Sequence, residues 1–348
     1  MKALITTIKG IEELAVAELT RIFSRLNVNV YSVDLRKGRG RAYLHLRVDE
    51  YKVAEILGEV LSEARLIERF IVIFAEGELE EIRRAVKERL AKLLTPWTAV
   101  GVRAERIRGE ELRSPQLASL LGRLIQEECG WIPISLDAPD LQVYCEIEDK
   151  LVRVGIDLAM AGGLHKRLYR LYVHPAMLNP IIANAMCELC GLEGRERVLD
   201  PMCGSGTILI ECKLKYPRVE AYGFDINPMH IEGAKLNSKA AGVSIRFEVA
   251  DVCEVASLFP EQFFDAIMTN PPYGIRERAI GGLRRVYTCL VEAAYKLLKE
   301  GGKLCVITPR RKLLLSQISM HGGFKVKKMI DIEEGGLKST IILLEKNT

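Results

Sequence analysis

Two short segments of this sequence carry residue types that can do chemistry together. Residues 198–207 read Val-Leu-Asp-Pro-Met-Cys-Gly-Ser-Gly-Thr, and residues 270–274, well downstream, read Asn-Pro-Pro-Tyr-Gly. A glycine-rich loop between a strand and a helix lets backbone amides approach a nucleoside-bearing ligand closely. The second segment can hold a planar amino group beside that ligand. Their order and separation predict methyl transfer from S-adenosylmethionine to an exocyclic nitrogen.

The glycine-rich segment is not a phosphate-binding loop. Its spacing from Asp200 to Gly204 and Gly206 differs from the GxGxxG of dinucleotide enzymes, and it lacks the lysine of a P-loop. This pattern fits a ligand without a pyrophosphate. Cofactor contacts are expected along the whole loop, from Asp200, Pro201, Met202, Cys203, Gly204, Ser205, Gly206 and Thr207.

Three aspartates are expected at the carboxyl ends of neighbouring strands, where open α/β sheets bind ligands. Asp200 can neutralise the amino group of a methionyl moiety, Asp225 can accept bonds from ribose hydroxyls, and Asp251 can accept the adenine amino group. Ile226 and Val252, which follow the last two, are expected to contact the cofactor too. The alternative is a glycine turn with aspartates that only cap helices.

The second segment follows a predicted buried strand and is expected to be catalytic. The side-chain oxygen of Asn270 and the backbone carbonyl of Pro271 can each accept one N–H of an amine, so its lone pair points toward the methyl donor. Pro271 and Pro272 fix the backbone, and Tyr273 offers a face for stacking. Orientation and electrostatics supply the gain, and Asn270 is also expected to touch the cofactor. The alternative is an ordinary Pro-Pro turn.

The elements that must position these residues belong to a Rossmann-like domain at residues 179–348. Strand and helix patterns alternate there, which predicts a parallel, doubly wound sheet. Two last strands, at 326–332 and 340–345, predict an antiparallel hairpin at its edge, joined through Gly335-Gly336.

The pattern of strands and helices in the N-terminal part predicts two small α/β domains. Residues 1–75 follow a βαββαβ order that is typical of a ferredoxin-like domain, and residues 76–160 form a second unit. A glycine-rich and then basic stretch, residues 161–178, is expected to link them to the Rossmann-like domain.

On these motifs the chain resembles a known family. Residues 177–348 are similar to class I S-adenosylmethionine-dependent methyltransferases of amino groups, and residues 1–158 resemble the ferredoxin-like plus THUMP module of RNA-modifying enzymes. Residues 174–180, His-Pro-Ala-Met-Leu-Asn-Pro, resemble the segment joining these parts in THUMP-containing RNA guanine-N2 methyltransferases.

The resemblance implies an activity and a partner. It implies N2-methylguanosine formation in tRNA at position 6 of the acceptor stem, as in the archaeal enzymes of that specificity, with the THUMP part binding the acceptor end of tRNA. It assigns the cofactor to Asp200, Gly204, Asp225 and Asp251, and the amine to residues 270–273. Related position-10 enzymes usually carry aspartate where this chain has Asn270.

Other functions stay open on the sequence alone. They are methylation of tRNA guanosine 10 or of ribosomal RNA guanine N2, of adenine N6 in DNA, or of a glutamine amide in protein, and also a non-catalytic RNA-binding role. The RNA-binding type of N-terminal part argues against the DNA and protein substrates, and the intact motifs argue against a non-catalytic protein.

Composition sets wider limits. The chain has 348 residues, 49% of them hydrophobic and 28% charged, with a net charge of +4. No apolar stretch approaches the ~20 residues needed to span a membrane, and no secretory leader is apparent. The nine cysteines are scattered, so we expect a cytoplasmic protein with reduced thiols. The sequence does not decide the oligomeric state.

Basic residues are the candidates for phosphate contacts. They are Arg103, Arg106, Arg108, Lys166, Arg167, Arg170, Arg276, Arg310 and Arg311.

Other reactive or aromatic residues are expected to be structural. The five histidines show no metal-binding spacing, and no metal is expected. Cys187 and Cys190 are expected in the core or on the surface, and Cys203 is not expected to be a nucleophile. Trp97 and Trp131 are expected in the core rather than as stacking platforms.

Overall fold

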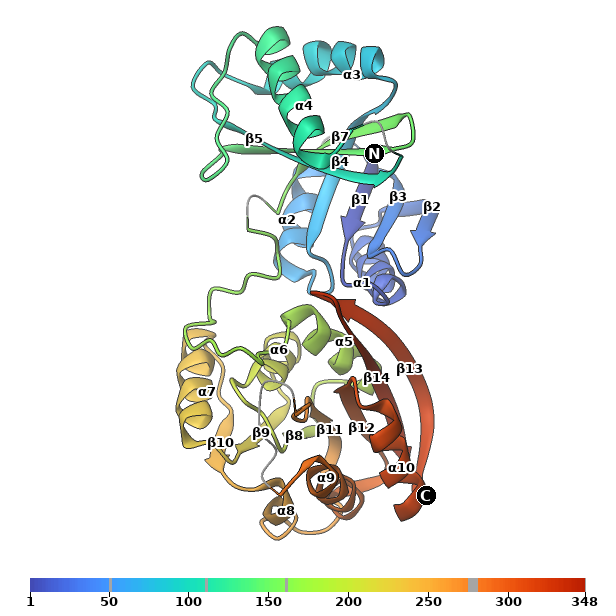
Figure 1. Cartoon of the computed structure of the whole chain (residues 1–348), viewed down its shortest axis with the longest axis vertical. Coiled ribbons are helices and arrows are strands. Elements are labelled where there is room, and N and C mark those ends of the chain that lie inside the picture. Colours follow the sequence, from blue (N-terminus) through green and yellow to red (C-terminus); the bar gives the residue numbers. More distant parts are fainter. Residues whose placement is uncertain (50–51, 110–111, 160–161, 275–280, 348) are drawn as a thin grey trace. The chain divides into compact units, whose positions relative to one another are not determined.

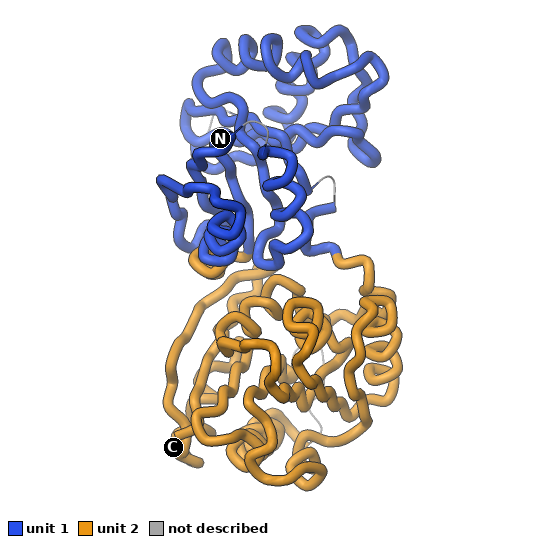
Figure 2. Tube along the Cα trace, turned by 180° about the vertical axis from the view of Figure 1, so that it is seen from behind, with its two compact units in different colours: residues 1–7, 15–166 blue, residues 8–14, 167–348 orange. Residues whose placement is uncertain are grey.

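The chain forms two compact units in the computed structural model, which describes residues 1–49, 52–109, 112–159, 162–274 and 281–347. The first unit comprises Met1–Thr7 and Ala15–Lys166, and the second comprises Ile8–Leu14 and Arg167–Thr348 (Figure 2). Most of the predicted linker therefore packs with the second unit. The predicted limits of the ferredoxin-like, THUMP and Rossmann-like domains stay predictions.

The first unit is built on one seven-stranded sheet with the order β2-β3-β1-β4-β7-β6-β5. β5 and β6 are parallel, and the other neighbouring strands are antiparallel. Because β4 pairs with β7, the two predicted small domains share this sheet (Figure 1). Its elements are β1 Lys2–Thr6, α1 Glu12–Arg25, β2 Asn29–Arg36, β3 Arg41–Arg47, α2 Val53–Glu63, β4 Arg69–Gly77, α3 Leu79–Ala85, β5 Val100–Arg108, α4 Ser114–Cys129, β6 Leu141–Glu148 and β7 Leu151–Asp157.

The expected βαββαβ order of the N-terminal residues is confirmed by β1 to β4. Residues 79–93 are helical but do not form one continuous α-helix. α3 is followed by a π-helical turn, Val86–Leu90, and a 3₁₀ turn, Ala91–Leu93. Ile82, Val86 and Leu90 still face the core at helical spacing, so the apolar periodicity survives although the hydrogen bonds change.

The second unit confirms the predicted doubly wound α/β fold. Its sheet order is β10-β9-β8-β11-β12-β14-β13, parallel from β10 to β12. The predicted terminal hairpin is present, and β14 pairs antiparallel with both β12 and β13. The elements are α5 Pro180–Cys190, β8 Arg197–Asp200, α6 Thr207–Lys215, β9 Glu220–Asp225, α7 Pro228–Ala240, β10 Arg246–Val249, α8 Val252–Val255, β11 Phe264–Thr269, α9 Leu283–Leu297, β12 Leu298–Thr308, α10 Arg311–His321, β13 Phe324–Glu334 and β14 Leu337–Lys346.

Helices cover this sheet in two groups. α5, α6 and α7 pack beside one another, and α9 packs against α8 and α10 (Figure 1). The hydrophobic core on the α9 face includes Phe224, Phe264 and Leu290. Local sequence starts these helices where the site needs them, because Asn179 caps α5 and Asn227 caps α7, each followed by a proline at the first helical turn.

Candidate cofactor and amine site

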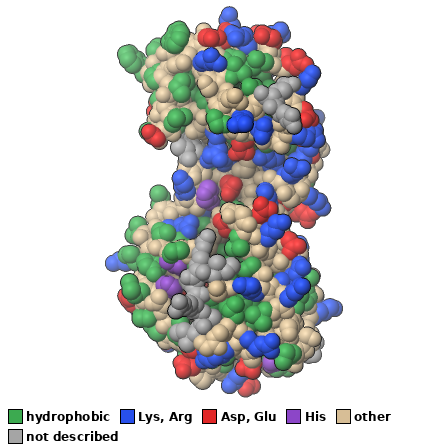
Figure 3. All heavy atoms as spheres, in the orientation of Figure 1, with side chains coloured by type: hydrophobic (Ala, Val, Ile, Leu, Met, Phe, Trp, Pro, Cys, Tyr) green, Lys and Arg blue, Asp and Glu red, His purple; other side chains and the backbone are tan. Residues whose placement is uncertain are grey.

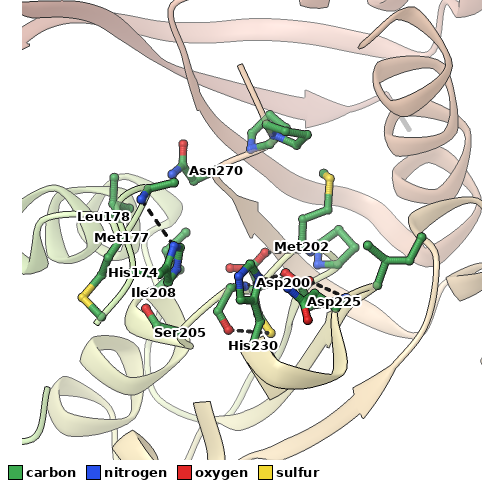
Figure 4. A pocket seen from close by; sticks show the side chains of 18 of the residues that line it. His174, Met177, Leu178, Asp200, Met202, Ser205, Ile208, Asp225, His230 and Asn270 are labelled. Atoms are coloured by element: carbon green, nitrogen blue, oxygen red, sulfur yellow. Dashed lines mark hydrogen bonds and ion pairs between the residues drawn. The ribbon is translucent and has the colours of Figure 1, made fainter. Parts of the chain in front are cut away.

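One cavity of about 690 Å³ opens at the carboxyl ends of the parallel strands. This volume lies within the ~300–1,000 Å³ usual for ligand pockets. Of the residues predicted to bind the cofactor or the amine, all but Gly206 line it. Figure 4 shows Asp200, Asp225, His230 and Ser205 grouped on one side, with Asn270 apart from them.

The glycine-rich loop is bent back onto the sheet by its own backbone. The amide of Cys203 donates to Phe224 O at 2.7 Å, and the amide of Gly206 donates to Cys203 O at 2.8 Å. Gly204 and Gly206 have φ of 50° and 80°, a region that favours glycine. A Cβ on Gly206 would lie 2.9 Å from the ring of Phe247. Gly206 thus shapes the loop from behind and starts α6.

Asp200, the last residue of β8, is buried at the floor of the cavity. Its Oδ1 accepts the amide of Met202 at 3.1 Å. Burial raises the pKa of this carboxyl to about 7, and nearby Asp225 adds to the rise. A cationic ligand group beside Asp200 would favour its ionised form.

Asp225, the last residue of β9, holds the loop and one wall together. Its Oδ2 accepts the Gly204 amide at 2.9 Å, and its Oδ1 accepts the Asn227 amide at 2.9 Å. His230 Nδ1 lies 3.3 Å from the same Oδ1. A carboxylate has about four acceptor positions, so ligand hydroxyls can share this group.

A histidine from the linker completes this wall. His174 stacks on His230 with ring centroids 4.6 Å apart, and its Nε2 would lie 3.1 Å from a Cβ on Gly204. Burial, and then His230, lower the pKa of His174 to about 4, so the ring is neutral at pH 7. Sequence reasoning missed both histidines, because only the fold brings residue 174 beside residue 230.

Asp251 lines the cavity and also makes two structural contacts. Its Oδ1 caps α8 by accepting the amide of Cys253 at 3.0 Å, and its Oδ2 lies 3.0 Å from Arg285 Nη2. The helix-capping role that the sequence left open is therefore real for Asp251. Its predicted contact with adenine stays a prediction.

The Asn-Pro-Pro-Tyr segment directly follows β11 and is internally bonded. The hydroxyl of Tyr273 donates to Oδ1 of Asn270, and Arg310 Nε donates to Tyr273 O at 3.1 Å. Burial, followed by Tyr287 and Glu334, raises the pKa of Tyr273, so its hydroxyl keeps its proton at neutral pH. The tyrosine thus fixes which end of the Asn270 amide is the acceptor.

The other cavity walls come from segments to which the sequence assigned no site role. The end of the linker contributes Ala176, Met177 and Leu178, and the tip of the terminal hairpin contributes Glu334 and Leu337. No local motif marks these residues as part of a site.

The residues predicted to bind RNA differ in their exposure to solvent and in their ion pairs. Arg106 and Lys166 are exposed, Arg170 Nε lies 2.8 Å from Met177 Sδ, and Arg276 lies outside the described residues. Exposed ion pairs join Arg103 to Glu105, Arg108 to Asp149 and Arg311 to Asp331. On the face drawn in Figure 3, basic side chains gather over the first unit's strands, interspersed with acidic ones.

Arg167 has a structural contact that the sequence did not indicate. Its Nε lies 3.0 Å from Glu211, whose side chain is fully buried, and Tyr169 donates to the same carboxylate at 2.8 Å. This ion pair is inside the second unit, so Arg167 anchors the linker. Its predicted contact with RNA stays a prediction.

Two expectations are wrong. Trp97 and Trp131 are 87% and 77% exposed, so they are not core residues; each lies in a connection beside β5 or α4 rather than in an apolar face of an element. Cys253 and Cys289 form a disulfide between α8 and α9, so not all thiols are reduced. Cys187 and Cys190 are buried, as expected for core residues.

The remaining cysteines and acidic groups show no metal site among the described residues. In these ranges no group of three or more His, Cys, Asp or Glu side chains is placed to hold a metal ion. Burial raises the pKa of Cys203 well above its usual range, which leaves a thiol that is a poor nucleophile. Within the described part of the chain, no helix is long and apolar enough to cross a membrane.

Comparison with known proteins matches both halves of the chain. Residues 167–340 match the family model described as the RMKL-like methyltransferase domain. The tRNA (guanine(6)-N2)-methyltransferase of Archaeoglobus fulgidus is 26% identical, over 97% of this chain and 90% of that protein. The enzyme of the same name from Thermus thermophilus is 29% identical over 98% of both chains. The crystal structure of TrmN from Thermus thermophilus superposes with a TM-score of 0.82 and 26% identity, covering 99% of each chain.

Proposed function

This chain belongs to the family of RMKL-like methyltransferase domains, and on that premise we propose that it is a tRNA guanine-N2 methyltransferase that uses S-adenosylmethionine. We further propose that its target is guanosine 6 in the acceptor stem. The full-length likeness to two enzymes named for guanine 6 supports this choice. The single structural observation behind it is the joint placement of Asn270 and the strand-end carboxylates on one cavity.

The residues of the cavity fit this cofactor. S-adenosylmethionine, when bound, supplies an electrophilic methyl group. Asp200 would hold its ammonium group, Asp225 its ribose hydroxyls and Asp251 its adenine end, at the carboxyl edge of three adjacent strands. Gly204 has a positive φ, and a Cβ there would crowd His174, so glycine fits this position best. Without a side chain, its backbone can approach the ligand.

In this mechanism the protein orients the guanine amine and does not remove a proton from it before the methyl group is transferred. Asn270 Oδ1, fixed by the Tyr273 hydroxyl, would accept one N2–H of guanine, and Pro271 O would accept the other. The N2 lone pair then points out of the ring plane.

A paired guanine is inaccessible, so it must leave the stem at a cost of a few kcal/mol. Contacts to phosphates offset that cost, and the THUMP part is proposed to bind the acceptor end. The proposal includes the cytoplasmic location expected from the sequence.

Methyl transfer from labelled S-adenosylmethionine to unmodified tRNA transcripts tests this function. We expect N2-methylguanosine at position 6 after nucleoside digestion and mapping, with loss of label when that guanosine is replaced. Label at guanosine 10 would keep the chemistry and contradict the position. Label only in DNA or in a protein glutamine would overturn the substrate class.

A further inference from the structure

The tip of the terminal hairpin places a carboxylate in the wall of the cavity. Glu334 ends β13, Leu337 begins β14, and both residues line the cavity. The turn between them is made by Gly335 and Gly336 with φ of 54° and 81°, the signature of a tight two-residue hairpin turn. Tyr273 lies close enough to Glu334 for that charge to act on its hydroxyl. Glu334 and the Asn-Pro-Pro-Tyr segment therefore line the same cavity.

A second residue fixes the direction of this carboxylate. Asn179 Nδ2 donates to Glu334 Oε1 at 2.7 Å, while Asn179 Oδ1 accepts the amide of Ile181 at 2.9 Å as the cap of α5. Because the cap uses the amide oxygen, the amide nitrogen must point at Glu334. A carboxylate offers about four acceptor positions on two oxygens, so a ligand donor can bind without displacing Asn179.

A carboxylate at this place distinguishes the bases that carry an exocyclic amine. In guanine the carbon that bears the N2 amine has two ring-nitrogen neighbours, N3 with a lone pair and N1 with a hydrogen. In adenine and cytosine the ring nitrogen next to the amine carries a lone pair instead. An ionised carboxylate only accepts hydrogen bonds, so it matches the N1–H of guanine and repels the lone pair of the other two bases.

We propose that Glu334 selects guanine by accepting its N1–H while Asn270 and Pro271 hold the N2 amine. This inference rests on the proposed function and adds the residue that decides the base. It also explains why a segment shared with adenine N6 chemistry needs a further contact. Asn179 is then a positioning residue, since it acts through Glu334.

The same strand offers a matched control. Glu333 is the preceding residue, and its side chain lies 3.1 Å from Lys9 rather than in the cavity wall. Glu333→Gln and Glu334→Gln remove the same charge from adjacent positions of β13. If only the total charge of the hairpin mattered, both variants would show the same effect.

The test uses the full-length chain and RNA with one changed base. Guanosine at the mapped target site is replaced by 2,6-diaminopurine, which keeps the N2 amine but has a lone pair at N1. The kcat/KM ratio of guanine to 2,6-diaminopurine is measured for the wild type and both variants. Comparing this ratio between proteins cancels any difference in base-pair strength between the two RNAs.

We expect the wild type to prefer guanine by roughly 10- to 100-fold, the size of a hydrogen bond to a charged group. In Glu334→Gln the amide NH₂ can donate to the lone pair, so the ratio should fall toward one, whereas Glu333→Gln should keep the wild-type ratio. Glu334→Asp should lower both rates but still prefer guanine. Melting temperature and cofactor affinity verify that each variant is folded.

Two results would overturn the inference. One is a Glu334→Gln ratio within about twofold of the wild type, and the other is an equal fall in Glu333→Gln. Failure of the proposed function is distinguishable, because it appears in the wild type as no methyl transfer to guanine in any RNA.

Discussion

Asn270 and Tyr273 illustrate how single residues set the chemistry of this site. The sequence predicts that the asparagine oxygen holds the amine, and the structure adds that the Tyr273 hydroxyl already donates to that oxygen. One lone pair of the oxygen is thereby used, and the amide cannot turn its NH₂ toward the amine. Tyr273 thus orients Asn270, and its role as a stacking face stays a prediction.

Replacing Asn270 should strongly lower the rate of methyl transfer while leaving the affinity for the cofactor largely unchanged. We expect Asn270→Ala to lower kcat by about 10²–10³-fold, as for loss of one oriented polar group in a transition state. Asn270→Asp keeps an oxygen acceptor and should retain measurable activity. Single-turnover rates and calorimetry with S-adenosylmethionine check this, and an alanine variant with near-normal rates would contradict the amine clamp.

Cofactor affinity should depend on pH through Asp200. Its pKa is raised to about 7 by burial, so the carboxylate that attracts the ammonium group is lost as pH falls below about 7. We expect the dissociation constant to rise by up to about tenfold per pH unit between pH 7 and 5. Asp200→Asn should bind weakly and without this slope; a slope that persists in the variant would assign it to another group.

The same shift predicts an opposite effect on the unliganded protein. A carboxyl whose pKa rises from 3.8 to about 7 on folding is held in its neutral form by the fold. Its contribution to stability is present below pH 4 and is lost as pH rises through 7. The difference in melting temperature between the wild type and Asp200→Asn should therefore change with pH in that window.

At the level of elements, the linker is part of the cavity wall. Asn237 on α7 accepts the amide of Tyr172 at 2.8 Å and donates to Tyr172 O at 3.0 Å. It also donates to Ser205 O at 3.2 Å. One buried side chain therefore joins the linker, α7 and the glycine-rich loop, and the tyrosine ring packs against Gly233.

Asn237→Ala should loosen this junction. Backbone groups of Tyr172 and Ser205 would lose their partner inside the protein, at a cost of ~1–3 kcal/mol, so the melting temperature should drop by several degrees. Cofactor affinity should weaken as well. Lys239→Ala, on the exposed side of the same helix, is the control, and equal effects in both variants would refute the role of Asn237.

The disulfide ties α8, which follows Asp251, to α9, which carries Arg285. Its cysteines are 36 residues apart, so reduction should cost about 2–4 kcal/mol. We expect reductant to lower the melting temperature of the wild type and to weaken cofactor binding. Cys289→Ser should show the lower temperature with or without reductant, and an unchanged wild type under reductant would show that the bond is not formed in solution.

Over the whole molecule, positive charge is mostly balanced by neighbouring acids. Arg103, Arg108 and Arg311 are in ion pairs, and Arg167 is paired with the buried Glu211. The net charge of +4 is therefore spread thinly. RNA affinity is expected to depend on a few exposed cations in the clusters predicted from the sequence, Arg106 and Lys166 among them.

Salt dependence of tRNA binding tests those two residues. Each lost phosphate contact should reduce the slope of log K against log salt by about 0.7–0.9. Arg106→Ala and Lys166→Ala should each show this decrease with the methyl-transfer position unchanged. Lys235→Ala, from an exposed pair with Glu232 on α7, should leave the slope as it is; an equal change there would point to charge in general.

The sequence by itself determined the parts of this protein that depend on neighbours along the chain. The glycine-rich loop, the three strand-end aspartates, the Asn-Pro-Pro-Tyr segment and the alternation of strands and helices are local patterns, and one topology brings them to a common edge. Only the tertiary structure decided which distant residues meet there: His174 on His230, Glu334 beside Tyr273, Arg167 on Glu211, and Cys253 bonded to Cys289. The pairing of Arg167 with the buried Glu211 and the exposure of Trp97 have the same origin, because a residue's environment is set by the elements packed against it and not by its sequence neighbours.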